Sequence, residues 1–180
     1  MKLLALSGSL RKASYNTAAL EALSSLAPSD IEIQIGNIAD LPLYNPDLEG
    51  ESIPSLDELK AVLAEASGLI IASPEYAHGI SGPMKNALDW LVSGEEFPYK
   101  PIMLINTSPR ACHAQEALKE VLTTMSGILV DSAYVSLPLL SSGLDRDGIL
   151  ADTALCHSLK TGLNNFRTGI EVSSNNRLID

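Results

Sequence analysis

The chain has 180 residues, of which 46% are apolar and 19% charged, a balance typical of one globular domain with a full hydrophobic core. Its formal net charge of −10 argues against a broad surface for nucleic acid or anionic membranes, so any phosphate must bind at a local site. No apolar run reaches the ~18 residues of a membrane-spanning helix. The cysteines, Cys112 and Cys156, have neither metal-binding spacing nor a CxxC pattern, which favours reduced thiols and a cytoplasmic protein.

Five segments predict strands. The start of the chain, residues 1–6, superficially resembles a signal peptide, but the polar residues 7–9 and the basic residues 11–12 cut the apolar run short and favour a strand. The runs at 3–6, 69–72 and 102–105 are continuously apolar, as in a parallel sheet with both faces buried. Residues 31–35 alternate, which places them nearer a sheet edge, and a fifth strand is expected around 130–137.

Helical periodicity separates these strands. Apolar positions on one face predict helices after Ser14 to about residue 26, and over about 56–66, 84–91, 114–125 and 147–166. Alternating strands and helices indicate a doubly wound α/β sheet. A surface loop is expected at 41–54. The domain is expected to span residues 1–168, followed by a polar tail at 169–180.

Three loops lie where the carboxyl ends of the strands meet one edge of the sheet, the place where such sheets bind ligands. The first loop, residues 7–17, enters a helix whose N-terminus offers unpaired N–H groups and partial positive charge to a phosphate. Gly8 allows a tight turn there. The candidate phosphate ligands are Ser9, Arg11, Ser14, Asn16 and Thr17.

Two common nucleotide-binding motifs are missing from this loop. It contains neither GxxxxGK[ST] nor GxGxxG, and the second strand ends at Gly36-Asn37 without an acidic residue for a ribose hydroxyl. A mononucleotide phosphate therefore fits better than a dinucleotide. The alternative is that Ser14 only caps the helix and the rest is an ordinary loop.

The second loop, residues 73–83, is rich in glycine and proline and opens the next helix. Glycines such as Gly79 leave N–H groups open to a flat ring, such as the isoalloxazine of a flavin. Tyr76 is expected to pack against that ring, while Glu75 shapes the loop. The alternative is a surface loop with an ordinary tyrosine. For His78, a solvated loop histidine is favoured over a titrating group at the site.

The third loop, residues 106–113, is polar and joins a buried strand to a helix. By position it closes over the other edge of the flavin site, with Ser108 at that edge. Arg110 either meets a nicotinamide nucleotide phosphate or is simply solvated.

The helix after the second loop carries two further features. Lys85 and Asp89 are four residues apart, a spacing that allows them to pair. Trp90 is the single tryptophan of the chain. The sequence leaves open whether Trp90 belongs to the core or to a subunit interface.

Two motifs give the chain a family resemblance. One is Gly8-Ser9-Leu10-Arg11 with Ser14 and Asn16; the other is Ser73-Pro74-Glu75-Tyr76 followed by Gly82, Lys85-Asn86-Ala87 and Asp89-Trp90. On these motifs the chain resembles the NADPH-dependent FMN reductases of flavodoxin-like fold, a group that also contains quinone, azo-dye and chromate reductases. The layout is similar over about residues 1–165. The resemblance implies a five-stranded parallel sheet of order 2-1-3-4-5 with helices on both faces.

The resemblance also implies a site. FMN is the expected cofactor, NADPH or NADH the co-substrate, and a small molecule the electron acceptor: a quinone, flavin, azo dye or metal oxyanion. No catalytic side chain and no metal are expected, because the flavin carries the chemistry. A homodimer or homotetramer is implied, since the family is usually dimeric or tetrameric. By this resemblance, the phosphate is bound by Ser9, Arg11, Ser14, Asn16 and Thr17. The isoalloxazine is lined by Pro74, Glu75, Tyr76 and Gly79.

The sequence departs from the family pattern at two places. Ala77 stands where many members have asparagine, so a side-chain contact to flavin or substrate is either missing or replaced, with His78 as the candidate replacement. The third loop has Pro109-Arg110-Ala111-Cys112 in place of a glycine pair. These departures concern the side of the site where the electron acceptor is expected.

Three functions remain at this point. The first is an oxidoreductase that passes hydride from NAD(P)H through FMN to a small acceptor, which the two loops on one sheet edge favour. The second is a flavodoxin-like carrier of single electrons, with which the strong acidity is compatible. The third is a structural or regulatory domain without FMN.

Overall fold

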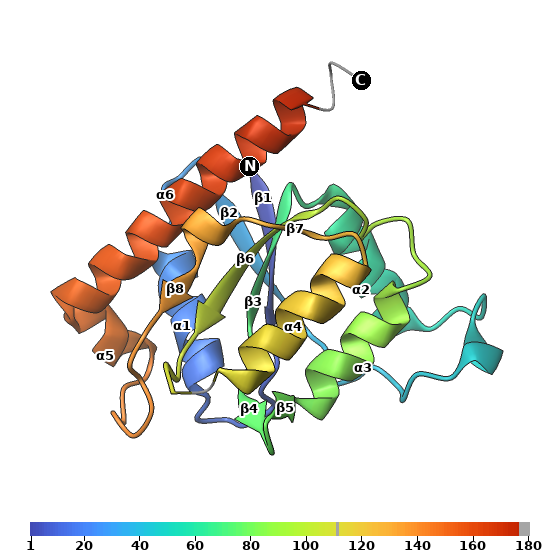
Figure 1. Ribbon diagram of the computed structural model, residues 1–180, viewed down its shortest axis with the longest axis horizontal. Coiled ribbons are helices and arrows are strands. Elements are labelled where there is room, and N and C mark those ends of the chain that lie inside the picture. Colours follow the sequence, from blue (N-terminus) through green and yellow to red (C-terminus); the bar gives the residue numbers. More distant parts are fainter. Residues whose placement is uncertain (111, 177–180) are drawn as a thin grey trace.

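The computed structural model, which describes residues 1–110 and 112–176, has a central sheet between two layers of helices (Figure 1). The strands are β1 Lys2–Ser7, β2 Glu32–Gly36, β3 Gly68–Ala72, β4 Glu75–Tyr76, β5 Gly79–Ile80, β6 Pro101–Asn106, β7 Ile128–Leu129 and β8 Val135–Ser136. The helices are α1 Tyr15–Leu26, α2 Pro54–Glu65, α3 Gly82–Leu91, α4 His113–Thr124, α5 Arg146–Ala151 and α6 Thr153–Asn176. Short 3-10 helices occupy Pro46–Leu48 and Asp131–Ala133.

The main sheet has the order β2-β1-β3-β6-β7, and β8 also pairs with β6. Every pairing in it is parallel; Leu4 of β1, for example, lies between Gln34 of β2 and Leu69 of β3. This is the predicted 2-1-3-4-5 order, with β6 as the fourth strand and β7 with β8 as the fifth. It is the strand order of the flavodoxin-like fold, and β2 lies at the edge, as its alternating sequence predicts.

The predicted fifth strand is wrong in detail. The 3-10 helix Asp131–Ala133 divides it into β7 and β8, each of two residues, and both pair with β6. Two-residue strands show no periodicity that the sequence could reveal. The paired strands also begin earlier than expected, at Ile128.

The predicted last helix is two helices. Asp152 separates them, because its carboxylate accepts the N–H groups of Ala154 (2.8 Å) and Leu155 (3.0 Å) and so caps α6. The helix α6 then continues past residue 166 to Asn176, and Ile170 is buried. The apolar face thus extends into the segment expected to be a tail, of which residues 177–180 lie outside the described residues.

Two hydrophobic cores lie on the two faces of the sheet. Alternate residues of each central strand enter different cores: Ala5 and Ile70 on one side, Leu4 and Leu69 on the other. The first core packs under α1, α5 and α6, and the second under α2, α3 and α4. The elements on the two faces appear on opposite sides of the sheet in Figure 1. Burial on both faces explains why β1, β3 and β6 read as continuous apolar runs.

The long loop after β2 is fastened to α3 by Asn86 and Trp90. The carbonyl oxygen of Pro42 accepts hydrogen bonds from Asn86 Nδ2 (2.9 Å) and Trp90 Nε1 (2.8 Å), while Asn86 Oδ1 accepts the N–H of Tyr44 (2.8 Å). The Tyr44 and Trp90 rings meet edge to face at 5.1 Å. Trp90 is 2% exposed, so within this chain it is a core residue.

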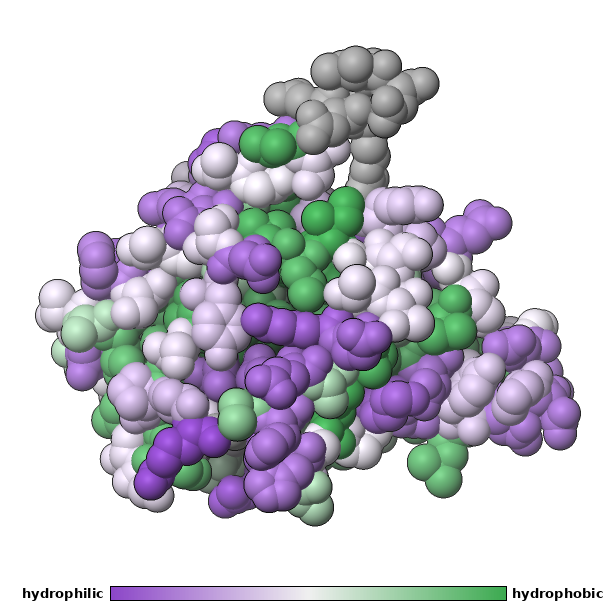
Figure 2. Space-filling model, in the orientation of Figure 1, coloured by the Kyte–Doolittle hydropathy of each residue, from purple (hydrophilic) through white to green (hydrophobic). Residues whose placement is uncertain are grey.

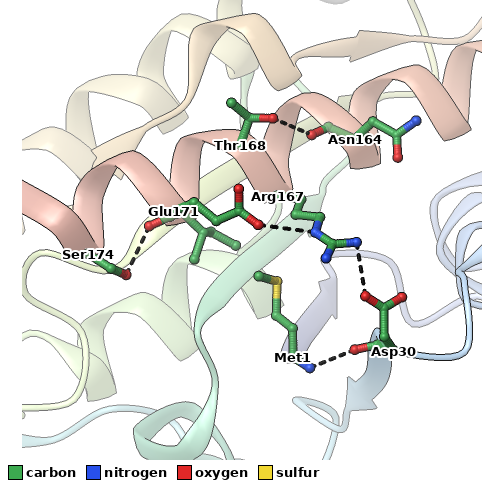
Figure 3. A network of polar contacts seen from close by, with 8 residues as sticks. Met1, Asp30, Asn164, Arg167, Thr168, Glu171 and Ser174 are labelled. Carbon is green, nitrogen blue, oxygen red and sulfur yellow. Dashed lines mark hydrogen bonds and ion pairs between the residues drawn. The ribbon is translucent and has the colours of Figure 1, made fainter.

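The C-terminal part of α6 is tied to the start of the chain. The Arg167 guanidinium pairs with Asp30 (2.9 Å) and with Glu171 on its own helix (3.2 Å), and the Met1 ammonium donates to the Asp30 carbonyl oxygen (2.6 Å), as Figure 3 shows. These groups are exposed, so each pair contributes little stability. They join α6 to the segment that precedes β2 and to the first residue of the chain.

The surface mixes polar and apolar side chains. Figure 2 shows hydrophilic side chains over much of one face, with apolar ones between them. Within residues 1–110 and 112–176, no helix combines the length and hydropathy that crossing a bilayer requires.

Candidate active site

The three loops predicted at one sheet edge meet around a cleft. They follow β1, β3 and β6, which are neighbours in the sheet, so their carboxyl ends lie side by side. The cleft is lined by Ser9, Arg11, Ala13, Ser14, Tyr15 and Asn16 of the first loop, Ser73, Pro74, Glu75 and Tyr76 of the second, Asn106, Thr107 and Ser108 of the third, and Leu140. Most of the predicted site residues therefore lie together.

Four predicted residues do not line this cleft. Thr17 instead lines a neighbouring hollow between α1 and the segment 140–147. His78 is an exposed residue of the second loop, Gly79 is half-buried in β5, and Arg110 is an exposed residue of the third loop. The sequence analysis also missed lining residues. Asn106 and Thr107 had a signal, since they directly follow a buried strand, but Leu140 follows a two-residue strand and had none.

The first loop presents the N-terminus of α1 to the cleft. Ser14 is the N-cap, and its hydroxyl oxygen accepts the N–H of Thr17 at 3.2 Å. The cap does not compete with a ligand role, because the hydroxyl proton can still be donated to an anion. The first turn of α1 has no acidic residue, and Arg11 lies beside it. Partial positive charge and a guanidinium therefore meet at one place.

Buried hydrogen bonds join the loops to one another. The Ser81 hydroxyl donates to the Gly8 carbonyl oxygen at 2.6 Å, and links the second loop to the first. The Thr107 hydroxyl donates to Asn16 Oδ1 at 3.0 Å, and links the third loop to the start of α1. Gly8 continues the β1–β3 pairing through its N–H to Ala72. The edge of the cleft is thus fixed by contacts within the protein.

Replacing Gly8 with alanine is expected to disrupt the cleft. The new Cβ would lie 2.5 Å from Ser73 Oγ and 2.9 Å from Ser81 Oγ, and Ser81 is fully buried. Forcing an extra carbon into packed space costs about 1–3 kcal/mol, so ligand affinity should fall about five- to 150-fold where the first and second loops separate. Titration with FMN measures this, and an unchanged dissociation constant with an unchanged circular dichroism spectrum would contradict it.

The second loop contains a small hairpin that the sequence analysis did not predict. The strands β4 and β5 pair antiparallel, Glu75 with Ile80 and Tyr76 with Gly79. The two residues between them, Ala77 and His78, have φ of 49° and 60°. Positive φ at both positions is typical of a type I′ turn, which usually contains asparagine or glycine. Without those residues the sequence carries no turn signal.

Replacing Ala77 with asparagine is expected to stabilise the protein by about 0.5–1 kcal/mol, because asparagine tolerates the left-handed region better than alanine. Urea unfolding measures the change. The same substitution at Ala64, an exposed position inside α2, serves as a control of opposite sign, since asparagine is a poorer helix former. Equal effects at both positions would rule out a turn-specific cause.

Glu75 joins this hairpin to α4. Its Oε2 accepts the N–H of Ala114 at 2.9 Å, and its Oε1 lies 3.1 Å from His78 Nδ1. The Ala114 N–H is the main cause that lowers the pKa of Glu75; His78 and His113 lower it further, while partial burial opposes them. The carboxylate is therefore held in its ionised form. This fits the structural role that the sequence predicted, and leaves Glu75 a poor proton donor at neutral pH.

The third loop is anchored at its start. Asn106 Oδ1 accepts the N–H of Ser108 at 2.9 Å, which turns Ser108 into the cleft. At its end, the His113 ring meets the His78 ring edge to face at 4.5 Å. The third loop therefore borders both the cleft and the hairpin.

The donor set fits a flavin mononucleotide. Serine hydroxyls, the N-terminus of α1 and Arg11 suit a phosphate dianion. Tyr76 is 52% exposed at the rim and offers an aromatic face. Among the described residues, no cluster of three or more histidine, cysteine or acidic side chains could hold a metal ion.

The chain is similar to known proteins over most of its length. Residues 1–140 match the family described as NADPH-dependent FMN reductase. The NAD(P)H-dependent FMN reductase of Pseudomonas aeruginosa is 31% identical over 158 residues, which cover 84% of this chain and 85% of that protein. The quinone reductase of Escherichia coli is 30% identical over 157 residues, which cover 83% and 81%.

A solved structure extends the likeness to three dimensions. The flavoenzyme NAD(P)H:acceptor oxidoreductase of Paracoccus denitrificans superposes with a TM-score of 0.72 at 27% identity, covering 93% of this chain and 97% of that one. The carrier of single electrons and the domain without FMN are therefore disfavoured. The chain belongs to the NADPH-dependent FMN reductase family and is an oxidoreductase that uses FMN and NAD(P)H.

Proposed function

We propose that this protein passes hydride from NAD(P)H through bound FMN to a small acceptor: a quinone, a flavin, an azo dye or a metal oxyanion. The observation that carries the proposal is one cleft that joins the cationic N-terminus of α1, with Arg11, to the exposed aromatic ring of Tyr76. The proteins that the chain resembles are named for FMN, quinone and general acceptor reduction.

The residues divide between the two ends of the cofactor. Ser9, Arg11, Ser14, Asn16 and Thr17 hold the phosphate, with Thr17 acting indirectly, because its N–H donates to Ser14 and its hydroxyl bonds to Ser7 (2.8 Å). The isoalloxazine lies on Pro74, Glu75, Tyr76 and Gly79, with Glu75 contributing its backbone, because its carboxylate oxygens contact Ala114 and His78. When bound, FMN supplies the group that accepts and donates hydride, so the protein has to bind, orient and exclude water.

The acceptor side is assigned to Ser108, His78 and Arg110. Ser108 lines the cleft. His78 and Arg110 are exposed and do not line the cleft, so their assignment rests on their loops, which border it. An open cleft with a mixed polar and apolar lining favours a planar acceptor of modest size over a protein partner.

Turnover with purified, FMN-loaded protein tests the proposal. We expect steady NADPH or NADH oxidation that depends on added FMN and on an acceptor such as benzoquinone. A yellow protein that NAD(P)H does not bleach, and that exchanges single electrons with dithionite alone, would instead support the carrier function. Failure to bind FMN would contradict both.

We propose a homodimer or homotetramer in the cytoplasm. Large apolar side chains beside the cleft, Leu10, Tyr76 and Leu140, are exposed in the single chain and suit burial against another subunit. The two cysteines are unpaired, which suits a reducing compartment. Light scattering gives the oligomeric state.

A further inference from the structure

The β4–β5 hairpin lies apart from the main sheet. It forms a two-stranded sheet of its own, with two residues in each strand, next to the N-terminal end of α4 at the bottom of Figure 1. An isolated two-stranded hairpin is at best marginally stable in water. Its turn also places two non-glycine residues in the left-handed region. The hairpin therefore needs an anchor outside itself to keep one position.

The start of α4 needs a hydrogen-bond acceptor for its first N–H groups. Its N-cap residue, Cys112, makes no side-chain hydrogen bond to the helix, so the first N–H groups are without a cap of their own. Glu75 Oε2 reaches across from the hairpin to the Ala114 N–H, and α4 packs on both β4 and β5. One carboxylate thus satisfies a helix donor and anchors the hairpin.

The second oxygen of Glu75 secures the turn. Oε1 contacts His78 Nδ1 inside the turn, and the His78 ring rests against His113 in the first turn of α4. The Glu75 side chain is 14% exposed and that of His78 is 77% exposed. The Glu75 carboxylate is therefore the more buried side of this contact, and His78 is its solvent-exposed partner.

We propose that Glu75 is a positioning residue that holds the β4–β5 hairpin on α4 and thereby fixes Tyr76 at the rim of the cleft. Tyr76 follows Glu75 directly in β4, and about half of the residue is exposed, so the position of β4 determines where its side chain stands at the rim. This inference rests on the proposed FMN site, since its effect on ligands passes through the Tyr76 ring.

A double-mutant cycle on FMN affinity tests the proposal. Glu75→Ala is expected to raise the dissociation constant of FMN about three- to tenfold when Tyr76 is present, and less than twofold in a Tyr76→Ala background. Quenching of FMN fluorescence by the Tyr76 ring should decrease in Glu75→Ala. Glu75→Gln keeps an acceptor oxygen without the charge, so it should fall between Glu75→Ala and the wild type.

A matched control separates positioning from helix capping. Asp152→Ala removes a carboxylate that caps α6 away from the cleft, and should lower stability without changing FMN affinity or quenching. If Glu75→Ala itself unfolds, the cycle is run with Glu75→Gln. Equal losses of affinity with and without Tyr76, or no loss in a folded variant, would overturn the proposal. If the wild-type protein fails to bind FMN, it is the proposed function that fails.

Discussion

Replacing Trp90 with alanine is expected to lower the free energy of unfolding by about 3–5 kcal/mol, the usual range for removing a buried aromatic side chain. The residue is almost fully buried in the core under α2, α3 and α4. Its indole N–H is also a donor to Pro42, so the substitution removes one of the three hydrogen bonds by which α3 side chains fasten the loop after β2. Cavity formation and a lost hydrogen bond act in the same direction.

Urea unfolding of Trp90→Ala and Trp90→Phe separates these two contributions. Phenylalanine keeps most of the apolar volume and loses only the donor, so its loss should be near the ~1 kcal/mol of a single hydrogen bond plus a small packing defect. A loss in Trp90→Ala below about 1 kcal/mol would mean that the loop and core repack freely around the site.

Replacing Arg11 with alanine is expected to weaken FMN binding by about 1.5–3 kcal/mol, or roughly 10- to 150-fold, the value of a hydrogen bond to a charged group. Arg11 lines the cleft beside the N-terminus of α1, where Ser14 is the N-cap. The formal net charge of −10 makes this local cation more important, because the rest of the molecule repels a phosphate dianion.

Two comparisons make the measurement specific. Arg11→Lys should keep part of the affinity, because an ammonium retains the charge without the planar fork. Riboflavin, which has no phosphate, should bind the wild type and Arg11→Ala with similar affinity. An equal loss for riboflavin and FMN would place Arg11 away from the phosphate.

The sheet could be predicted from sequence because the burial of its central strands leaves a pattern within each strand's own residues. β1, β3 and β6 are buried on both faces, and burial leaves a continuous apolar run that any reader of the sequence can find. The division of the last strand and the break at Asp152 were not predicted. Both depend on short segments whose conformation is set by their neighbours in space, and not by a repeating pattern.

The site could be predicted only in outline. The parallel order places the ends of neighbouring strands together, so the grouping of Ser9, Tyr76 and Ser108 follows from topology. The hairpin at Ala77 does not follow, because its turn uses unusual backbone angles. The bond from Glu75 to α4 does not follow either, because it joins residues that lie 39 positions apart. Leu140 of the cleft was not predicted because it follows a two-residue strand, which leaves no pattern in the sequence.

The buried bonds from Ser81 to Gly8 and from Thr107 to Asn16 have a consequence for how the cofactor comes and goes. Because the loops are fastened to each other and not through a ligand, an arriving flavin has little backbone to order and loses little affinity to conformational entropy. The cleft is therefore formed by contacts within the chain. Departure of the flavin likewise does not require these bonds to break, so exchange with free flavin in solution is compatible with the fold.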